Sequence, residues 1–229
     1  MNEILRADNV SKKFSMGGKT VDALSRVNLS VFSGQYVSIV GPSGAGKSTL
    51  LYLLGLIDSA SEGQILFKGK VISDLSPRRK ARFRGDHIGF VFQSFYLLPE
   101  LNCLQNVAIP SFIQDPKKFW KRKEIYKKAR IMLHKVGLGD RLIHKPAEMS
   151  GGEMQRVAIC RSLMNGPSII LADEPTGNLD SKNSEVVADL LFSLCREEGK
   201  ALVLATHNEN LARRADKIVK LIDGKIVGS

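Results

Sequence analysis

Residues 41–49 read Gly41-Pro42-Ser43-Gly44-Ala45-Gly46-Lys47-Ser48-Thr49, which fits the phosphate-loop pattern G-x-x-x-x-G-K-[ST]. The preceding residues, 36–40, are apolar and mostly β-branched, which predicts a buried parallel strand, and residues 49–56 predict a helix. Glycine-rich loops at helix N-termini present backbone N–H groups to anions. We therefore expect all nine residues to bind a nucleotide. Lys47 would reach its β- and γ-phosphates, and Ser48 would offer a hydroxyl to Mg²⁺.

The positive charge of the chain has three interpretations that the sequence leaves open. The 229 residues carry a net charge of +11, and much of the excess lies in residues 77–84 and 116–130. Such runs are typical of solvated helix faces, of a surface that meets anionic lipid head groups, or of a contact with RNA or DNA.

Length, cysteines and hydropathy narrow the class of protein. The length suits one large domain or one domain with a subdomain. The scattered Cys103, Cys160 and Cys195 are typical of small buried residues in a reducing compartment rather than of disulfides. We expect no signal peptide and no transmembrane segment, because no apolar run reaches about 18 residues.

Strand and helix patterns alternate along most of the chain, which indicates an α/β fold. An antiparallel β layer is expected from residues 4–10 and 21–32, before the phosphate loop. Further strands are expected at 63–69, 88–92, 168–172 and 201–205, and a hairpin at 217–222 and 225–227 around Asp223-Gly224. Helices are expected at 152–164, 184–198 and 208–214. Residues 97–149 interrupt this alternation with mostly helical patterns, at 102–109 before Pro110 and at 117–136, which indicates an inserted subdomain.

Polar side chains directly follow several of the predicted strands. Ligands of open parallel sheets bind at the carboxyl ends of the strands. Asp173 is the expected acidic ligand of Mg²⁺, and Gln93 offers it an amide oxygen. Glu174 would polarise the attacking water as a catalytic base, and His207 would hold that water or contact the γ-phosphate. Phe14 is a candidate for stacking on a base, although an ordinary core aromatic explains it too.

A second phosphate-binding feature lies far along the chain. Ser150, Gly151, Gly152 and Glu153 precede a predicted helix, with Ser150 and Glu153 spaced as a capping box. Two glycines at a helix start also form an anion-binding nest. A chain with two such nests and one set of catalytic groups suggests that the second completes the nucleotide site of another subunit.

Together these motifs resemble the ATP-binding subunits of ABC transporters over nearly the whole chain. Residues 41–49 are similar to Walker A, Gln93 to the Q-loop glutamine, residues 150–156 to the signature motif, residues 169–174 to Walker B with its catalytic glutamate, residues 178–180 to the D-loop with Asp180, and His207 to the switch histidine. Phe14 falls where the family stacks an aromatic on adenine.

The resemblance implies a P-loop NTPase fold in a single domain, residues 1–229. Its mainly parallel core sheet and antiparallel β subdomain would come from residues 1–93 and 150–229, and its helical subdomain from about 94–149. It also implies an ATPase that uses ATP and Mg²⁺, with the signature residues and Asp180 contributing to a nucleotide site shared by a homodimer. The dimer would lie at the cytoplasmic face of the inner membrane, with its helical subdomain and Gln93 region against integral membrane subunits.

Three further stretches resemble the LolD/MacB/FtsE subfamily. They are Gly89-Phe-Val-Phe-Gln-Ser-Phe-Tyr-Leu-Leu-Pro99, Asn106-Val-Ala-Ile-Pro110 and Pro175-Thr-Gly-Asn-Leu-Asp180. The second stretch and the length of the chain favour the lipoprotein-releasing branch, which works with LolC/LolE-like membrane subunits, over macrolide export or cell division. Cargo lipoprotein would be contacted only indirectly.

The sequence departs from the family pattern at Phe14, Met149, Met154 and Asn208, where Tyr, Leu, a polar residue and Asp are usual. None of these changes removes a phosphate, metal or catalytic group, so we expect an active ATPase and not an inactive binding module. A nucleic-acid-associated ATPase of the same family is a distant alternative, because such proteins usually carry two ATPase units or a long insert. We therefore expect no nucleic-acid partner.

Overall fold

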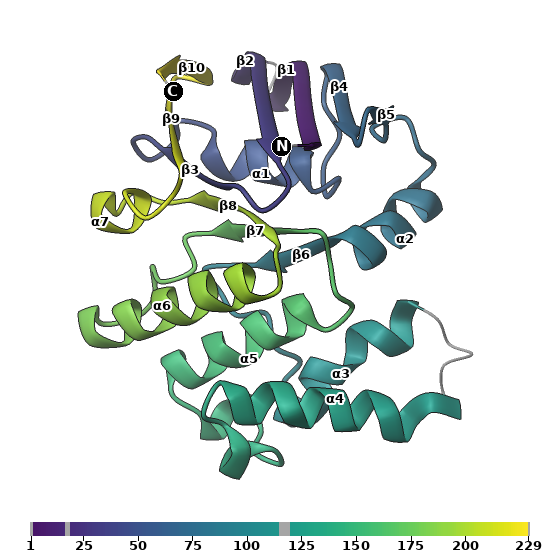
Figure 1. The fold of residues 1–229 in the computed structure, drawn as a ribbon. Coiled ribbons are helices and arrows are strands. Elements are labelled where there is room, and N and C mark those ends of the chain that lie inside the picture. Colours follow the sequence, from purple (N-terminus) through teal and green to yellow (C-terminus); the bar gives the residue numbers. More distant parts are fainter. Residues whose placement is uncertain (1, 17–18, 115–119, 229) are drawn as a thin grey trace.

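Two β-sheets lie on either side of helix α1 (Lys47–Leu54) (Figure 1). The computed structural model describes residues 2–16, 19–114 and 120–228. Its strands are β1 (Glu3–Met16), β2 (Lys19–Phe32), β3 (Tyr36–Val40), β4 (Glu62–Phe67), β5 (Lys70–Val71), β6 (Ile88–Val91), β7 (Ile169–Asp173), β8 (Ala201–Ala205), β9 (Lys217–Ile222) and β10 (Lys225–Gly228). The other helices are α2 (Pro77–His87), α3 (Cys103–Gln114), α4 (Arg122–Lys135), α5 (Gly151–Leu163), α6 (Ser181–Glu197) and α7 (Glu209–Ala212), with short 3₁₀ turns η2 (Gly139–Arg141) and η3 (Pro146–Glu148).

The larger sheet has the order β10-β9-β3-β8-β7-β6, with all neighbours parallel except β10. The smaller sheet, β2-β1-β4-β5, is antiparallel. The hairpin that joins β9 to β10 turns at Asp223 and Gly224, whose φ angles of 45° and 72° are both positive, as a type I′ turn requires. The predicted α/β class, with a mainly parallel sheet beside an antiparallel layer, is confirmed.

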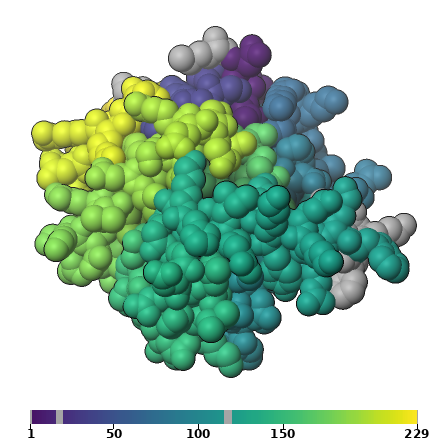
Figure 2. Space-filling model, turned by 60° about the horizontal axis from the view of Figure 1, so that its bottom comes forward, coloured from purple at the N-terminus to yellow at the C-terminus, as the bar shows by residue number. Residues whose placement is uncertain are grey.

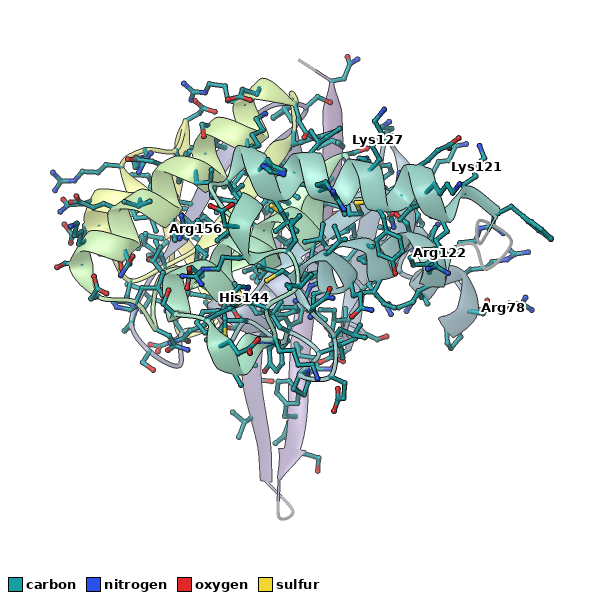
Figure 3. All side chains as sticks on the ribbon, turned by 90° about the horizontal axis from the view of Figure 1, so that it is seen from below. Arg78, Lys121, Arg122, Lys127, His144 and Arg156 are labelled. Atoms are coloured by element: carbon teal, nitrogen blue, oxygen red, sulfur yellow. The ribbon has the colours of Figure 1, made fainter. Side chains whose placement is uncertain are left out.

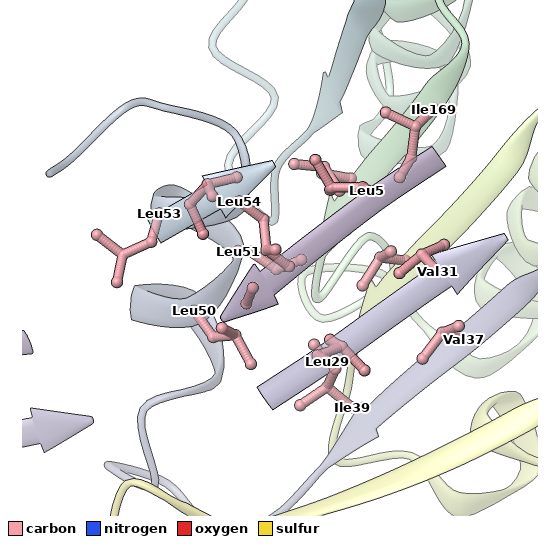
Figure 4. Close-up of a cluster of buried hydrophobic side chains, with 14 of the residues drawn as sticks. Leu5, Leu29, Val31, Val37, Ile39, Leu50, Leu51, Leu53, Leu54 and Ile169 are labelled. Carbon is pink, nitrogen blue, oxygen red and sulfur yellow. The ribbon is translucent and has the colours of Figure 1, made fainter. Parts of the chain in front are cut away.

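The central strands are buried on both faces, and alternate residues enter two different cores. Leucines of α1 pack against Val37 and Ile39 of β3 and against the antiparallel sheet (Figure 4). Residues of opposite parity, such as Ile170 and Leu202, join a second core with the helices on the other face. Because both faces are covered, these strands are almost wholly apolar, apart from the buried Ser38 of β3, and polar residues cluster beyond their carboxyl ends.

Helices α3, α4 and α5 lie on the far side of the larger sheet (Figure 1). In the space-filling view the segment around residues 100–150 forms much of the face turned toward the reader (Figure 2). The described part of the chain contains no helix with the length and hydropathy needed to cross a bilayer. All three cysteines are unpaired and buried, as expected from the sequence.

Several predicted boundaries were wrong. Helix α3 does not end before Pro110 but continues through it to Gln114. The helix is held beyond the proline by Asn165, whose Nδ2 donates to the Pro110 carbonyl at 3.3 Å and whose Oδ1 accepts from Ser111 Oγ at 2.7 Å. The start of the helix expected at 117–136 lies outside the described residues, and α4 begins at Arg122. The basic run 77–84 belongs to helix α2, with Pro77 at its first turn.

Candidate active site

The phosphate loop leaves β3 and enters α1 through two glycines that no other residue could replace without displacement of the chain. A Cβ on Gly41 would lie 2.1 Å from the Leu221 carbonyl oxygen. Gly46 caps the helix at φ +100°, and a Cβ there would lie 2.5 Å from the Ala23 carbonyl oxygen. Helix α1 therefore begins at Lys47, two residues earlier than predicted, and its free N–H groups face the loop.

Lys47 closes the loop on itself. Its side chain is largely buried, and Nζ donates to the carbonyl oxygens of Gly41 at 2.9 Å and Pro42 at 3.0 Å. The ammonium thus lies over the backbone concavity that phosphate oxygens would occupy. An entering phosphate offers this cation a full negative charge in exchange for two neutral carbonyls.

Asp173 and Ser48 meet at the end of β7. Ser48 Oγ donates to Asp173 Oδ1 at 2.9 Å. Burial raises the pKa of Asp173, and the hydrogen bonds from Ser48 and Tyr52 offset this in part. A buried carboxylate that lacks a paired cation is suited to gain one from a ligand.

This pair fits Mg²⁺ but does not form a complete cage for it. No cluster of three His, Cys, Asp or Glu side chains with metal-binding geometry occurs in the described residues. Magnesium commonly takes one or two protein carboxylates and completes its shell with phosphate oxygens and water. Ser48 and Asp173 are the residues that would hold it, and the remaining ligands would come with the nucleotide.

Glu174 follows Asp173 and is held from two directions. Its backbone has a φ of 43°, which is unusual for a residue other than glycine, and its N–H donates to the Ala205 carbonyl at 2.9 Å. Thr206 Oγ1 donates to Glu174 Oε2 at 3.2 Å, and His207 Nδ1 lies 2.9 Å from Oε1. Because a carboxylate only accepts, His207 carries its proton on Nδ1 in this pair. The carboxylate is 15% exposed and the imidazole 72% exposed, so the pair is accessible to a water molecule.

Gln93 exchanges two hydrogen bonds with Asn178. The side-chain Nε2 of Gln93 donates to Asn178 Oδ1, and the backbone carbonyl of Gln93 accepts from Asn178 Nδ2, both at 3.1 Å. This pairing joins the end of β6 to the segment that follows Glu174. Gln93 was predicted from the sequence, whereas its partner Asn178 and the partner of Glu174, Thr206, were not.

One cavity of about 400 Å³ brings nine of the predicted site residues together. Its lining consists of Ala23, Ser43, Gly44, Gly46, Lys47, Ser48, Thr49, Gln93, Glu174 and His207. Phe14 does not line it but lies on β1 with 37% of its surface exposed and Lys12 Nζ 4.9 Å from the ring centroid. The interpretation of Phe14 as a core aromatic is therefore wrong, and base stacking stays a prediction.

The second nest lies apart from this cavity. Ser150 caps helix α5, its Oγ accepting from the Glu153 N–H at 3.3 Å while Glu153 Oε2 accepts from the Ser150 N–H at 2.8 Å. The predicted capping box is thus present, and Arg141 Nε adds a contact to Glu153 Oε1 at 3.1 Å. The hydrogen bond from the Ser150 backbone lowers the pKa of Glu153. None of residues 150–153 lines the cavity.

Asp180 and Asn208 both cap helices. Asp180 Oδ1 accepts from the Asn183 N–H at 2.9 Å at the start of α6, and Asp180 does not line the cavity either. Asn208 Oδ1 accepts from the Leu211 N–H at 3.1 Å at the start of α7. Asn and Asp cap helices about equally well, so the replacement of Asp at position 208 preserves this local structure.

Gln155 connects helix α5 to the segments that carry Gln93 and Glu174. Its buried Nε2 donates to the Phe92 carbonyl at 3.1 Å and to the Pro175 carbonyl at 2.6 Å. Phe92 immediately precedes Gln93, and Pro175 immediately follows Glu174. One side chain of α5 therefore fixes the ends of two neighbouring strands.

An apolar groove of about 480 Å³ lies next to the Gln93 segment. Residues from α2, β6, α3 and α5 line it, among them Arg84, Phe90, Phe92, Ile109, Ile113 and Arg161. Ile113 is 73% exposed, an unusual degree for a large apolar residue.

The sequence and the structure both match known proteins. Residues 24–177 match the family model described as ABC transporter. The chain is 45% identical over 225 residues to the lipoprotein-releasing system ATP-binding protein LolD 1 of Rhodospirillum rubrum, with 98% of each chain covered. It is 46% identical over 228 residues to an uncharacterized ABC transporter ATP-binding protein of Thermotoga maritima, covering 100% of this chain and 95% of that one. The dimeric post-hydrolysis structure of the ATP-binding cassette MJ0796, bound to ADP and Pi, superposes with a TM-score of 0.89 at 41% identity and covers 98% of this chain and 97% of that chain.

Proposed function

This chain belongs to the ABC transporter family and is an ATP-binding subunit whose ATP hydrolysis is coupled to transport. From this premise we propose that it powers release of lipoproteins from the inner membrane toward the outer membrane. The observation that carries this proposal is the likeness to LolD proteins over the full chain. Two relatives described as uncharacterized ABC transporter ATP-binding proteins are equally similar, and reconstitution with a cargo distinguishes the alternatives.

The cavity supports a division of labour among its residues. Lys47 and the loop backbone bind the β- and γ-phosphates, and Ser48 and Asp173 hold Mg²⁺, with Gln93 positioned to add its amide oxygen. When bound, Mg²⁺ would neutralise part of the negative charge of the phosphates. Glu174 accepts a proton from the attacking water as general base. Thr206 and His207 keep its carboxylate in place, and Phe14 stacks on the adenine.

The separation of the two nests supports a homodimer. Residues 150–153 carry helix-end N–H groups suited to phosphate and lie outside their own chain's cavity. In the proposed dimer they cover the nucleotide of the other copy, and Asp180 reaches the same interface. The structures of MJ0796 are described as dimeric, which fits this arrangement. Ser150→Arg places a bulky cation at the nest and should abolish cooperative hydrolysis; retained cooperativity would contradict the shared site.

The apolar groove supports contact with membrane subunits. The groove is lined by α2, α3 and β6, the strand before Gln93. A helix of a LolC/LolE-like subunit that inserts there would contact these elements and so affect Gln93 at the nucleotide site. In this proposal residues 94–149 move as a helical subdomain, the rest forms the ATPase core, and the protein lies peripherally at the cytoplasmic face of the inner membrane.

Reconstitution tests the cargo. The chain is co-expressed with LolC/LolE-like subunits, and the purified complex is placed in proteoliposomes loaded with a lipidated protein. ATP should release the lipoprotein into the soluble fraction, and the Glu174→Gln complex should not release it. A complex that forms only with a macrolide-export or cell-division membrane subunit would instead support one of those alternatives.

A further inference from the structure

One face of helix α4 carries only basic residues around a tyrosine. Arg122, Lys123, Tyr126, Lys127 and Arg130 line a shallow hollow of about 430 Å³. Among the residues that the structure describes, no acidic one contributes to its lining. The hollow is therefore a concentration of positive charge on a part of the surface that the nucleotide site does not use.

Helical periodicity explains why these residues lie together. Lys123, Lys127 and Arg130 recur at spacings of four and three, so they share one face of the helix. The opposite face carries the buried Ile125 and Ala129, which pack into the core. In the view from below, α4 is an outer element of the molecule, and its labelled Lys127 points outward (Figure 3). We call Lys123, Tyr126, Lys127 and Arg130, with Arg122 beside them, the α4 basic face.

Three cations of the α4 basic face, Lys123, Lys127 and Arg130, are not neutralised by an ion pair within the described chain. Lys123, Lys127 and Arg130 are exposed, and no ion pair joins any of them to another described residue. Arg122 lies with its Cζ 5.9 Å from the Tyr126 ring centroid. The acidic Glu124 contributes to a different hollow, between α3 and α4. Lys123, Lys127 and Arg130 are thus available to an anionic partner.

A large aromatic residue stands at the end of this face. Trp120 precedes α4 and is 93% exposed, and Ile131 on the helix is 58% exposed. Tryptophan is enriched at membrane–water interfaces, where its apolar ring and its polar N–H are both accommodated. A Lys- and Arg-rich helix with exposed tryptophan is typical of elements that lie on anionic bilayers.

We propose that the α4 basic face, together with Trp120, binds directly to anionic phospholipid head groups. Lipid phosphates neutralise Lys123, Lys127 and Arg130, while Trp120 enters the head-group layer. The combination favours a bilayer over a nucleic acid, which offers phosphates but no apolar layer for an isolated tryptophan. The inference rests on the proposed function for its setting at a membrane. It adds a contact with the lipid itself, which can be measured on the ATPase alone.

Vesicle flotation tests this contact. Purified protein is mixed either with vesicles of phosphatidylcholine alone or with phosphatidylcholine vesicles that contain about 30% phosphatidylglycerol. The fraction of protein bound to each is measured at two salt concentrations. Each Lys or Arg near an anionic surface is worth about 1 kcal/mol, or roughly fivefold in affinity. The triple substitution Lys123→Gln, Lys127→Gln and Arg130→Gln should therefore weaken binding to the anionic vesicles about 100-fold. Trp120→Ala should weaken binding to the same vesicles without a change in its salt dependence.

A charge-matched control separates the face from net charge. Lys68→Gln, Lys70→Gln and Lys225→Gln remove three exposed cations from the β4–β5 turn, β5 and β10, and should leave vesicle binding within about twofold. Unchanged ATPase turnover in both triple variants shows that they are folded, and it separates this test from the proposed transport function. Equal binding of the wild type to both vesicle types, or equal losses in the two triple variants, would overturn the proposal. Tighter binding of a DNA or RNA duplex that depends on the same three residues would overturn it in favour of a nucleic-acid contact.

Discussion

Replacing Thr206 by Val should slow ATP hydrolysis without weakening ATP binding. Thr206 is 1% exposed, and its hydroxyl donates to Glu174 Oε2 at 3.2 Å while it accepts from the Asn208 N–H at 3.1 Å. Valine has nearly the same shape but makes neither hydrogen bond. A hydrogen bond to a charged group contributes about 1.5–3 kcal/mol, so kcat should fall by about 10- to 100-fold as the carboxylate loses its position. KM for ATP should stay the same, because Thr206 does not line the cavity.

The same substitution has a stability signature. The Asn208 N–H loses its acceptor, which costs about 1–3 kcal/mol and corresponds to a decrease in Tm of roughly 2–10 °C for a chain of this size. Thr206→Ser keeps the hydroxyl and serves as the matched control, with kcat close to that of the wild type. Steady-state ATPase kinetics and calorimetry measure both effects. A Val variant with wild-type kcat, or a Ser variant as slow as the Val variant, would refute the role assigned to this hydroxyl.

Four further predictions follow from other parts of the site and the core. Glu174→Gln should lower kcat by at least about 100-fold with ATP affinity retained in equilibrium binding; normal turnover would exclude Glu174 as the base. Gly46→Ala should lower ATP affinity at least about tenfold, because its Cβ would lie 2.5 Å from the Ala23 carbonyl oxygen; a variant that binds ATP normally would show that the loop tolerates the shift. The lowered pKa of Glu153 stabilises the fold above the ordinary carboxyl value of 4.5, and this contribution is lost as the pH falls through the lower folded-state value. Glu153→Gln should therefore flatten the dependence of unfolding free energy on pH below that point, and parallel pH curves for the two proteins would contradict it. Burial raises the pKa of Cys160 to about 12, so native protein should resist thiol alkylation at pH 8 and react after unfolding; rapid labelling of native Cys160 by mass spectrometry would count against its burial.

Strand ends were the most informative part of the sequence. The alternation of apolar runs with turn residues identified β3, β7 and β8, and the polar residues that follow them meet in or beside one cavity. Local patterns carry such information because a buried strand must be apolar and its ligand-binding end must not be. The capping box at Ser150 was predictable for the same reason, since both partners lie within one helical turn.

Contacts between distant segments could not be read in this way. Thr206 directly precedes His207, yet nothing in its surroundings indicates that it holds a carboxylate 32 residues away along the chain. Helix α3 passes through Pro110, and Asn165, far along the chain, binds Pro110 and Ser111 just beyond the expected break. In both places tertiary hydrogen bonds decide the structure, and local preference is overridden.

The two hydrogen bonds from Gln155 link the position of helix α5 to the position of the general base. Helix α5 cannot rotate away without pulling on the carbonyls of Phe92 and Pro175, and so on the segments that carry Gln93 and Glu174. In the proposed dimer, a copy that withdraws its Ser150 end from the neighbour's nucleotide would therefore also displace its own general base. The opening of one nucleotide site would therefore stop hydrolysis in the other site. Gln155 would then couple ATP hydrolysis in the two sites of the dimer.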